Sequence, residues 1–168
     1  MDEVKRAARK LAMDEFMEYI SDYREYTPAF KRIGMMFVSY GMYAPELFKL
    51  LFMQEHKGAQ GFGNILDDLG EFRNICVELI CRDYEISNED AQLLFEQCWT
   101  HAYGLGTLCA MRVCSLSEDE ISMRLGTNFA SHMMLIKSGK MNYVFDDVQQ
   151  RTDGIFHGIS VKEMPFTN

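Results

Sequence analysis

The side chains that most often perform chemistry in proteins are present in this chain, but not at the spacing that catalytic and metal sites require. None of the four histidines, His56, His101, His132 and His157, has a glutamate three residues before it. That removes the Glu-x-x-His arrangement of di-iron helix bundles. The chain also lacks an HExxH, P-loop, GxSxG or strand-associated GxGxxG motif. We therefore expect no enzyme, no catalytic residue, no metal site and no cofactor.

The cysteines and the net charge narrow the possible partners. The chain has five cysteines, an odd number, and no CxxC pair, so we expect reduced, buried thiols rather than disulfides or a four-cysteine zinc site. A formal net charge of -8 would repel phosphates, so this chain alone should not bind DNA. The same acidity slightly favours an apolar cation over an apolar anion as a ligand.

A third group of residues is suited to binding. The chain contains 12 phenylalanines and 13 methionines, and an unbranched thioether side chain adapts to irregular space. A helix bundle of this composition can enclose an apolar cavity with a few polar groups. The residues predicted to line it are Phe16, Ile20, Phe37, Tyr40, Phe72, Cys76, Trp99, Tyr103 and Met111. The alternative is that these side chains fill a solid core.

Helices must position these residues, because apolar side chains recur every three to four positions along most of the chain. The pattern predicts helices over residues 2–23, 27–43, 45–53, 64–82, 88–114 and 117–139, with a loop over 54–63. Pro45 cannot continue a helix, so it should end the second one near Tyr43. Thr27 is expected to cap that helix, with Pro28 at its first position. The predicted class is all-α with about six helices.

The length of 168 residues indicates one domain. We predict that this domain covers residues 1–139. Residues 140–168 are predicted to be a C-terminal extension with a short helix over 144–151 and an irregular tail. No apolar run approaches the roughly 20 residues needed to span a bilayer, and the N-terminus lacks the apolar segment of a secretory signal. We expect a cytoplasmic protein that does not enter membranes.

Glycines inside the fifth predicted helix suggest close helix packing. Gly104 and Gly106 each cost about 1 kcal/mol relative to alanine in a helix interior, so a facing helix should approach there, from the same chain or from a second subunit. The last two helices would otherwise expose a broad apolar patch, which indicates a homodimer with a four-helix interface. The predicted interface residues are Leu105, Gly106, Cys109, Ile121, Leu125, Phe129 and His132.

Two segments resemble the C-terminal regulatory domain of the tetracycline-repressor (TetR/AcrR) family of bacterial transcription regulators, in its WHG-like form. FVSYGMYAPELFKLLF, residues 37–52, is similar to that family's helix break before a proline. CWTHAYGLGTLCAMRV, which precedes SLSEDEI, is similar to its Trp and Gly helix, turn and final dimer helix. The resemblance covers roughly residues 2–139. Ala44 stands where the family usually has asparagine and Tyr103 where it usually has histidine, whereas Trp99 and Gly104 match.

The resemblance implies a homodimer that binds a small lipophilic effector and thereby alters the DNA affinity of a helix-turn-helix unit. Nothing before Asp2 supplies that three-helix unit, so we expect DNA to be bound only through an N-terminal domain that is not in this chain. A different class stays open, namely a stand-alone helical protein-interaction module with a solid core.

Overall fold

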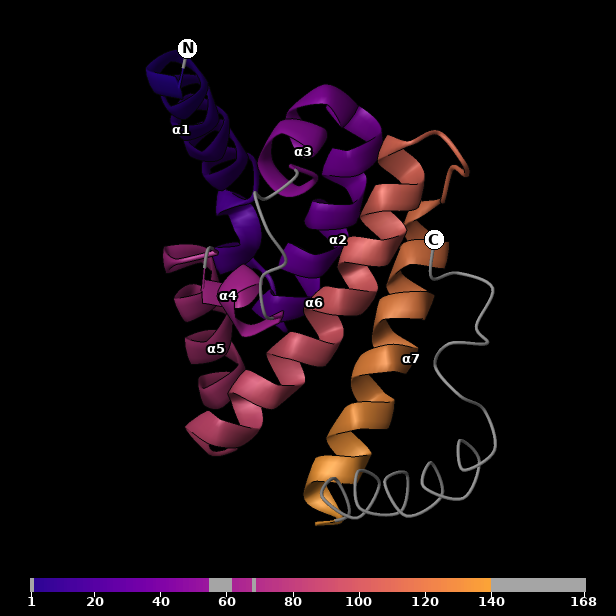
Figure 1. Cartoon of the computed structure of the whole chain (residues 1–168). Helices are drawn as coiled ribbons and strands as arrows, with labels where there is room; N and C mark the ends of the chain where they lie inside the picture. The colour runs from indigo at the N-terminus through magenta and orange to yellow at the C-terminus, as the bar shows by residue number, and fades with distance from the viewer. Residues whose placement is uncertain (1, 55–61, 68, 140–168) are drawn as a thin grey trace, which may run out of the picture. The chain divides into compact units, whose positions relative to one another are not determined.

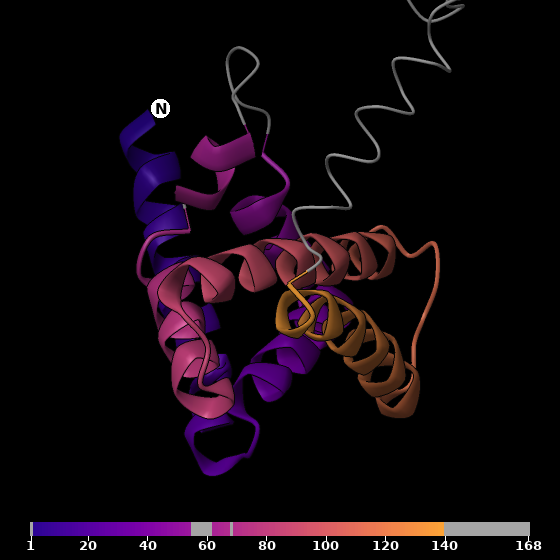
Figure 2. The same ribbon diagram turned by 90° about the horizontal axis from the view of Figure 1, so that it is seen from below.

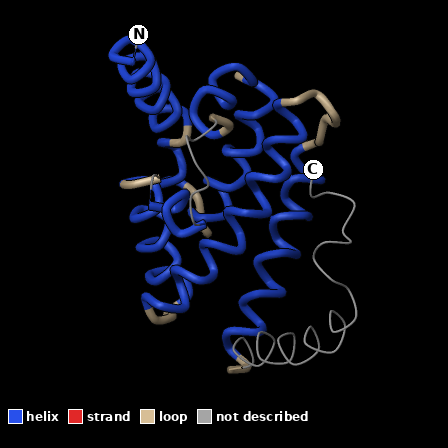
Figure 3. Tube along the Cα trace, in the orientation of Figure 1, coloured by secondary structure: helices blue, strands red, loops and turns tan. Residues whose placement is uncertain are grey.

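A computed structural model describes residues 2–54, 62–67 and 69–139 of the chain (Figure 1). These residues contain seven α-helices, one 3-10 helix and no strand (Figure 3), which confirms the all-α class. The elements are α1 (Asp2–Tyr19), η1 (Ser21–Glu25), α2 (Ala29–Tyr43), α3 (Pro45–Phe52), α4 (Phe62–Asp67), α5 (Glu71–Tyr84), α6 (Asn88–Ala110) and α7 (Glu118–Lys137). The predicted extension over 140–168, with its short helix, lies outside the described residues.

The chain divides after Ala130 into two compact units, and each is considered by itself. The fold and the site described below belong to the first unit, which contains α1 to α6 and most of α7. The predicted domain over residues 1–139 stays a prediction. No described helix combines the length and the apolar content needed to cross a membrane.

The break at Pro45 is present as predicted. Helix α2 ends at Tyr43 and α3 begins at Pro45, while Ala44 between them has φ -130° and ψ 61°. The start of α2 differs from the prediction, because Thr27 does not cap it. Pro28 holds the N-cap position with an extended backbone (φ -79°, ψ 133°), and the helix starts at Ala29 without a side-chain cap.

The single helix predicted over residues 64–82 is wrong, because the structure has two helices there, α4 and α5. They are separated by a turn at Gly70, whose φ of 52° lies in the region that glycine reaches without steric cost. Leu69 and Phe72 on either side of Gly70 are both buried. The apolar period therefore continues through a break in the backbone, and this explains why the pattern suggested one helix.

Side-chain caps start the two long C-terminal helices. At α6 the Ser87 hydroxyl accepts a hydrogen bond from the Asp90 N–H at 3.1 Å. A capping box starts α7, since the Ser117 N–H donates to the Glu120 carboxylate at 2.8 Å and the Glu120 N–H donates to the Ser117 hydroxyl at 3.3 Å. These hydrogen bonds hold the pKa of Glu120 below its ordinary value.

Helix α6 is central to the first unit and packs on α2, α3 and α5 (Figures 1 and 2). It approaches α2 closely, since a Cβ on Gly41 would lie 2.5 Å from the carbonyl oxygen of Gly106. Beside this contact a cluster of aromatic rings from α1, α2, α3, α5 and α6 fills the core. The N-terminal end of α1 projects from the bundle (Figure 1).

Candidate ligand cavity

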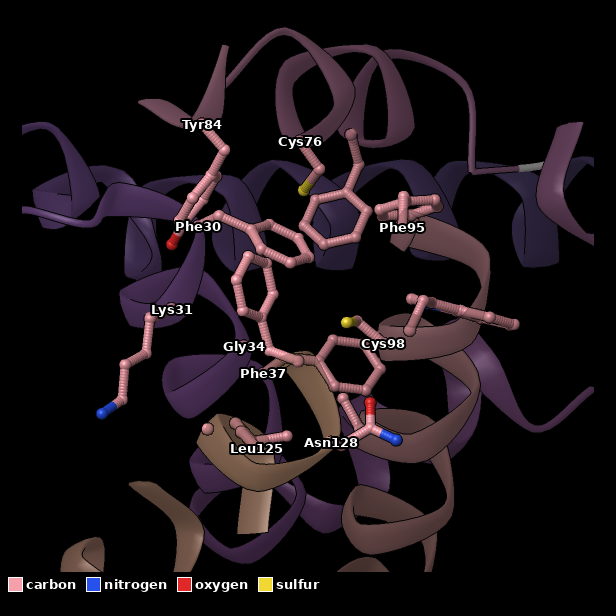
Figure 4. A pocket seen from close by; sticks show the side chains of 15 residues that line it. Phe30, Lys31, Gly34, Phe37, Cys76, Tyr84, Phe95, Cys98, Leu125 and Asn128 are labelled. Carbon is pink, nitrogen blue, oxygen red and sulfur yellow. The ribbon is translucent and has the colours of Figure 1, made fainter. Parts of the chain in front are cut away.

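A cavity lies in the first unit among α2, α5, α6 and α7 (Figure 4). It offers about 80 Å³ to the centre of a water-sized molecule. Its lining residues are Phe30, Lys31, Gly34, Phe37, Phe72, Cys76, Tyr84, Phe95, Cys98, Trp99, Ala102, Leu125, Gly126, Asn128 and Phe129. Four helices therefore meet around a space that their side chains leave unfilled.

Aromatic rings form most of the inner wall. Phe30 lies 6.4 Å from Phe95 and 6.2 Å from Phe129 between ring centroids, and Phe37 stacks with Phe72 at 6.5 Å. Phe37, Phe72 and Phe95 are all buried. Rings in these tilted and stacked arrangements are stable against one another, and they present apolar surface to the cavity.

Two thiols complete the inner wall. Cys76 and Cys98 are both buried, and burial alone raises the pKa of Cys98 to about 12 and the pKa of Cys76 still further from its ordinary value. Both thiols stay protonated at neutral pH, so they behave as small apolar groups rather than as nucleophiles. The inner wall of the cavity is therefore uncharged.

The polar lining residues lie at the rim, between the start of α2 and α7. Lys31, Tyr84 and Asn128 are more exposed than the inner residues, and Figure 4 shows them around the edge of the ring cluster. Burial raises the pKa of Tyr84 above its ordinary value, so its hydroxyl is neutral. Glycines on the two helices, Gly34 and Gly126, keep the seam narrow, since a Cβ on Gly34 would lie 3.3 Å from Leu125 Cδ1.

The structure brings four of the nine predicted pocket residues to this cavity: Phe37, Phe72, Cys76 and Trp99. Three others, Phe16, Ile20 and Tyr40, are buried in the filled aromatic core next to it, with Phe16 at 6.1 Å from Phe37. Tyr103 does not line the cavity, and its hydroxyl donates to the Phe52 carbonyl at 2.9 Å. Met111 lies beyond the end of α6 and is 53% exposed.

The residues predicted for a dimer interface fall into different environments. Leu125 and Phe129 line the cavity. Gly106, Cys109 and Ile121 are buried by their own chain, and Leu105 is half-buried. The close approach at Gly106 is to Gly41 of the same chain, which is one of the two alternatives that the sequence left open. His132 is a half-buried residue of the second unit.

Sequence reasoning missed several lining residues, namely Phe30, Lys31, Gly34, Tyr84, Phe95, Cys98, Ala102, Gly126 and Asn128. One available signal was the pair of glycines inside helices, Gly34 and Gly126, because glycine in a helix interior usually requires a packing reason. No comparable signal marks Lys31 or Asn128, whose positions depend on how α7 meets α2.

The described residues contain no group of three or more His, Cys, Asp or Glu side chains placed to hold a metal ion. Comparison with known proteins adds no analogy, since no family model, no curated protein and no solved structure matches this chain.

Proposed function

We propose that this chain is the effector-sensing and homodimerisation domain of a transcription regulator of the TetR/AcrR type, and that a small apolar molecule is its effector. The observation that carries the proposal is the cavity among α2, α5, α6 and α7. Water gains few hydrogen bonds in an apolar space, whereas an apolar molecule gains roughly 25 cal/mol for each Å² removed from water. The inner wall thus favours an aromatic or aliphatic ligand.

The proposed response to the ligand is a shift between two settings of the helices. Phe37 of α2 lines the cavity, and its ring centroid also lies 6.1 Å from that of Phe16 in α1. A ligand that displaces Phe37 would therefore displace α1. In this proposal a DNA-binding unit is joined ahead of α1. A ligand that binds one of the two settings more tightly would therefore change the distance between the two DNA-binding units of a dimer.

The outward face of α6 supports the dimer part of the proposal. Thr100, Gly104, Leu108 and, just past the helix, Met111 are exposed, and residues 97–111 include no Asp, Glu, Lys or Arg. A Cβ on Gly104 would meet nothing within 4 Å among the described residues. Interface centres are depleted of charge, so we propose that a second copy packs on this face.

Thermal unfolding with and without a panel of lipophilic compounds tests the binding proposal. At a free concentration 100 times its Kd, a ligand should stabilise the native state by about 2.7 kcal/mol. Ala102→Leu places a larger side chain in the cavity and should abolish this shift. Ala7→Leu makes the same change at an exposed position of α1 and should preserve it. If no compound shifts the unfolding temperature, the interaction module with a filled core is the better description.

A further inference from the structure

The charge at the rim of the cavity indicates which apolar molecules it accepts. Among the described residues that line the cavity, Lys31 is the one charged side chain, and none of them is acidic. On the basis of the proposed binding function, we propose that the ligand is an apolar anion, an aryl or alkyl carboxylate. Its hydrophobic part would fill the aromatic interior and its carboxylate would pair with Lys31. This reverses the preference for a cation that the net charge of the chain suggests.

The position of Lys31 suits this role. It belongs to the first turn of α2, and its Nζ lies 4.0 Å from the point where a Cβ on Gly126 of α7 would stand. The ammonium group therefore lies at the seam between the two helices, and Figure 4 shows the side chain extending outward from the rings, at the rim rather than in the interior. The first turn of α2 has no acidic residue and no side-chain cap, so the positive end of the helix dipole adds to the charge of the lysine.

Two acidic groups near the rim are paired with arginines. Asp83, which precedes the rim residue Tyr84, lies 2.7 Å from Arg82. Asp22 lies 2.7 Å from Arg32, the neighbour of Lys31. Within the described part of the chain Lys31 itself forms no ion pair. A ligand carboxylate would thus meet a cation that forms no ion pair with any carboxylate of the described residues.

The net charge of -8 does not outweigh this local arrangement. Exposed charges farther away than the Debye length, about 8 Å at physiological ionic strength, are largely screened. A carboxylate at the rim would respond mainly to Lys31, which lies within a few ångströms. The interior offers no carboxylate to a cationic ligand, although its ring faces could attract an ammonium group through cation–π contacts. That rival predicts the opposite order of affinities.

Three compounds with the same single ring, chosen for the small volume of the cavity, separate these possibilities: phenylacetate, its neutral amide and 2-phenylethylammonium. Calorimetric titration at low salt should show the carboxylate binding roughly fivefold more tightly than the amide, because a partly exposed ion pair contributes that much. The ammonium compound should bind most weakly. About 1 M NaCl should reduce the difference between carboxylate and amide, since it shortens the Debye length to about 3 Å.

Variants assign the preference to Lys31. Lys31→Gln should remove the difference between carboxylate and amide, and Lys31→Glu should make the ammonium compound the tightest of the three. Lys10→Glu makes the same change of net charge at an exposed position of α1 that lines no described cavity, so it should keep the original order. If all three compounds bind equally well, or if Lys31→Glu leaves their order unchanged, the anion proposal is wrong while the cavity proposal stands. If none of them binds, both proposals are wrong.

Discussion

Replacing Gly41 by alanine tests the close contact between α2 and α6. The new Cβ would lie 2.5 Å from the carbonyl oxygen of Gly106 and 3.2 Å from its carbonyl carbon. Ordinary carbon–oxygen contacts between helices are about 3.3 to 3.6 Å. The atoms that must move are backbone atoms of α6, so no side-chain rotation can relieve the overlap, and α2 and α6 must separate by roughly 1 Å.

The size of the effect follows from two opposing contributions. Overpacking a well-packed contact costs about 1 to 3 kcal/mol, while alanine in place of glycine favours a helix by up to about 1 kcal/mol. Because the overlap is with backbone atoms, the overpacking cost should lie at the upper end of its range, about 2 to 3 kcal/mol, so we expect a net loss of about 1 to 2 kcal/mol. For a chain of this size the loss corresponds to a fall in Tm of roughly 2 to 8 °C.

Urea unfolding followed by far-ultraviolet circular dichroism measures this loss. Gly104→Ala provides the matched control, because it makes the same change in α6 where a Cβ meets nothing within 4 Å in the described structure. Gly104→Ala should raise the free energy of unfolding by about 0.5 to 1 kcal/mol. Both variants are compared at one protein concentration, because Gly104 is on the proposed dimer face. If Gly41→Ala were as stabilising as Gly104→Ala, the contact between α2 and α6 would be looser than the structure shows.

Three further predictions concern other parts of the chain. Leu108→Asp should yield monomers in sedimentation, whereas Leu11→Asp, at an exposed position of α1, should leave the dimer intact; dimers of Leu108→Asp would exclude this face. Stability should fall above about pH 9, because burial raises the pKa of Cys98 from 9.0 to about 12. The unfolded chain loses the thiol proton first, which lowers stability by up to about 1.4 kcal/mol per pH unit between these values. In urea titrations Cys98→Ala should reduce this slope and leave the part due to Cys76, whose pKa burial also raises. Ser87→Ala should lower unfolding stability by about 1 kcal/mol, because Asp90 loses its hydrogen-bonded cap; no change would mean that water replaces the hydroxyl.

Local signals in the sequence predicted the helices well. Pro45 lacks a backbone donor, and the hydroxyls of Ser87 and Ser117 can accept from the next helical turn, so these residues fix helix ends wherever the chain folds. Thr27 failed as a cap because the backbone of Pro28 is extended and itself precedes the helix. The turn at Gly70 was missed because apolar residues on both sides face one core.

The cavity was only partly predictable, because its existence depends on tertiary packing. Aromatic residues such as Phe37 and Phe72 could be recognised as buried, but so could Phe16, which lies in filled core. Phe37 and Phe72 differ from Phe16 because open space lies beside them, next to the small residues Gly34 and Ala102. The sequence shows that these residues are small, but it does not show which of them face one another.

The pairing of α2 with α6 explains why a cavity can exist beside a contact as close as that of Gly41 with Gly106. The two helices run in the same direction, since Phe30 meets Phe95 at 6.4 Å between ring centroids and Gly41 meets Gly106 eleven residues later on each helix. Eleven residues span about 16 Å. Large rings hold the helices apart at one end, and glycines bring the backbones together at the other.

Because α2 and α6 are close at one end and apart at the other, the proposed ligand would move α2 in one particular direction. The glycine contact cannot close further, because backbone atoms already touch there and packed interiors are hardly compressible, so it can act as a pivot. A molecule among Phe30, Phe37 and Ala102 would therefore widen the open end and turn α2 about the glycine contact. The largest movement would occur at the start of α2, where Lys31 lies, and it would reach α1 through the contact between Phe37 and Phe16. A ligand bound at the glycine end would lie at the pivot and would move the start of α2 very little. The position of the cavity at the opposite end therefore supports a sensing role over a purely structural one.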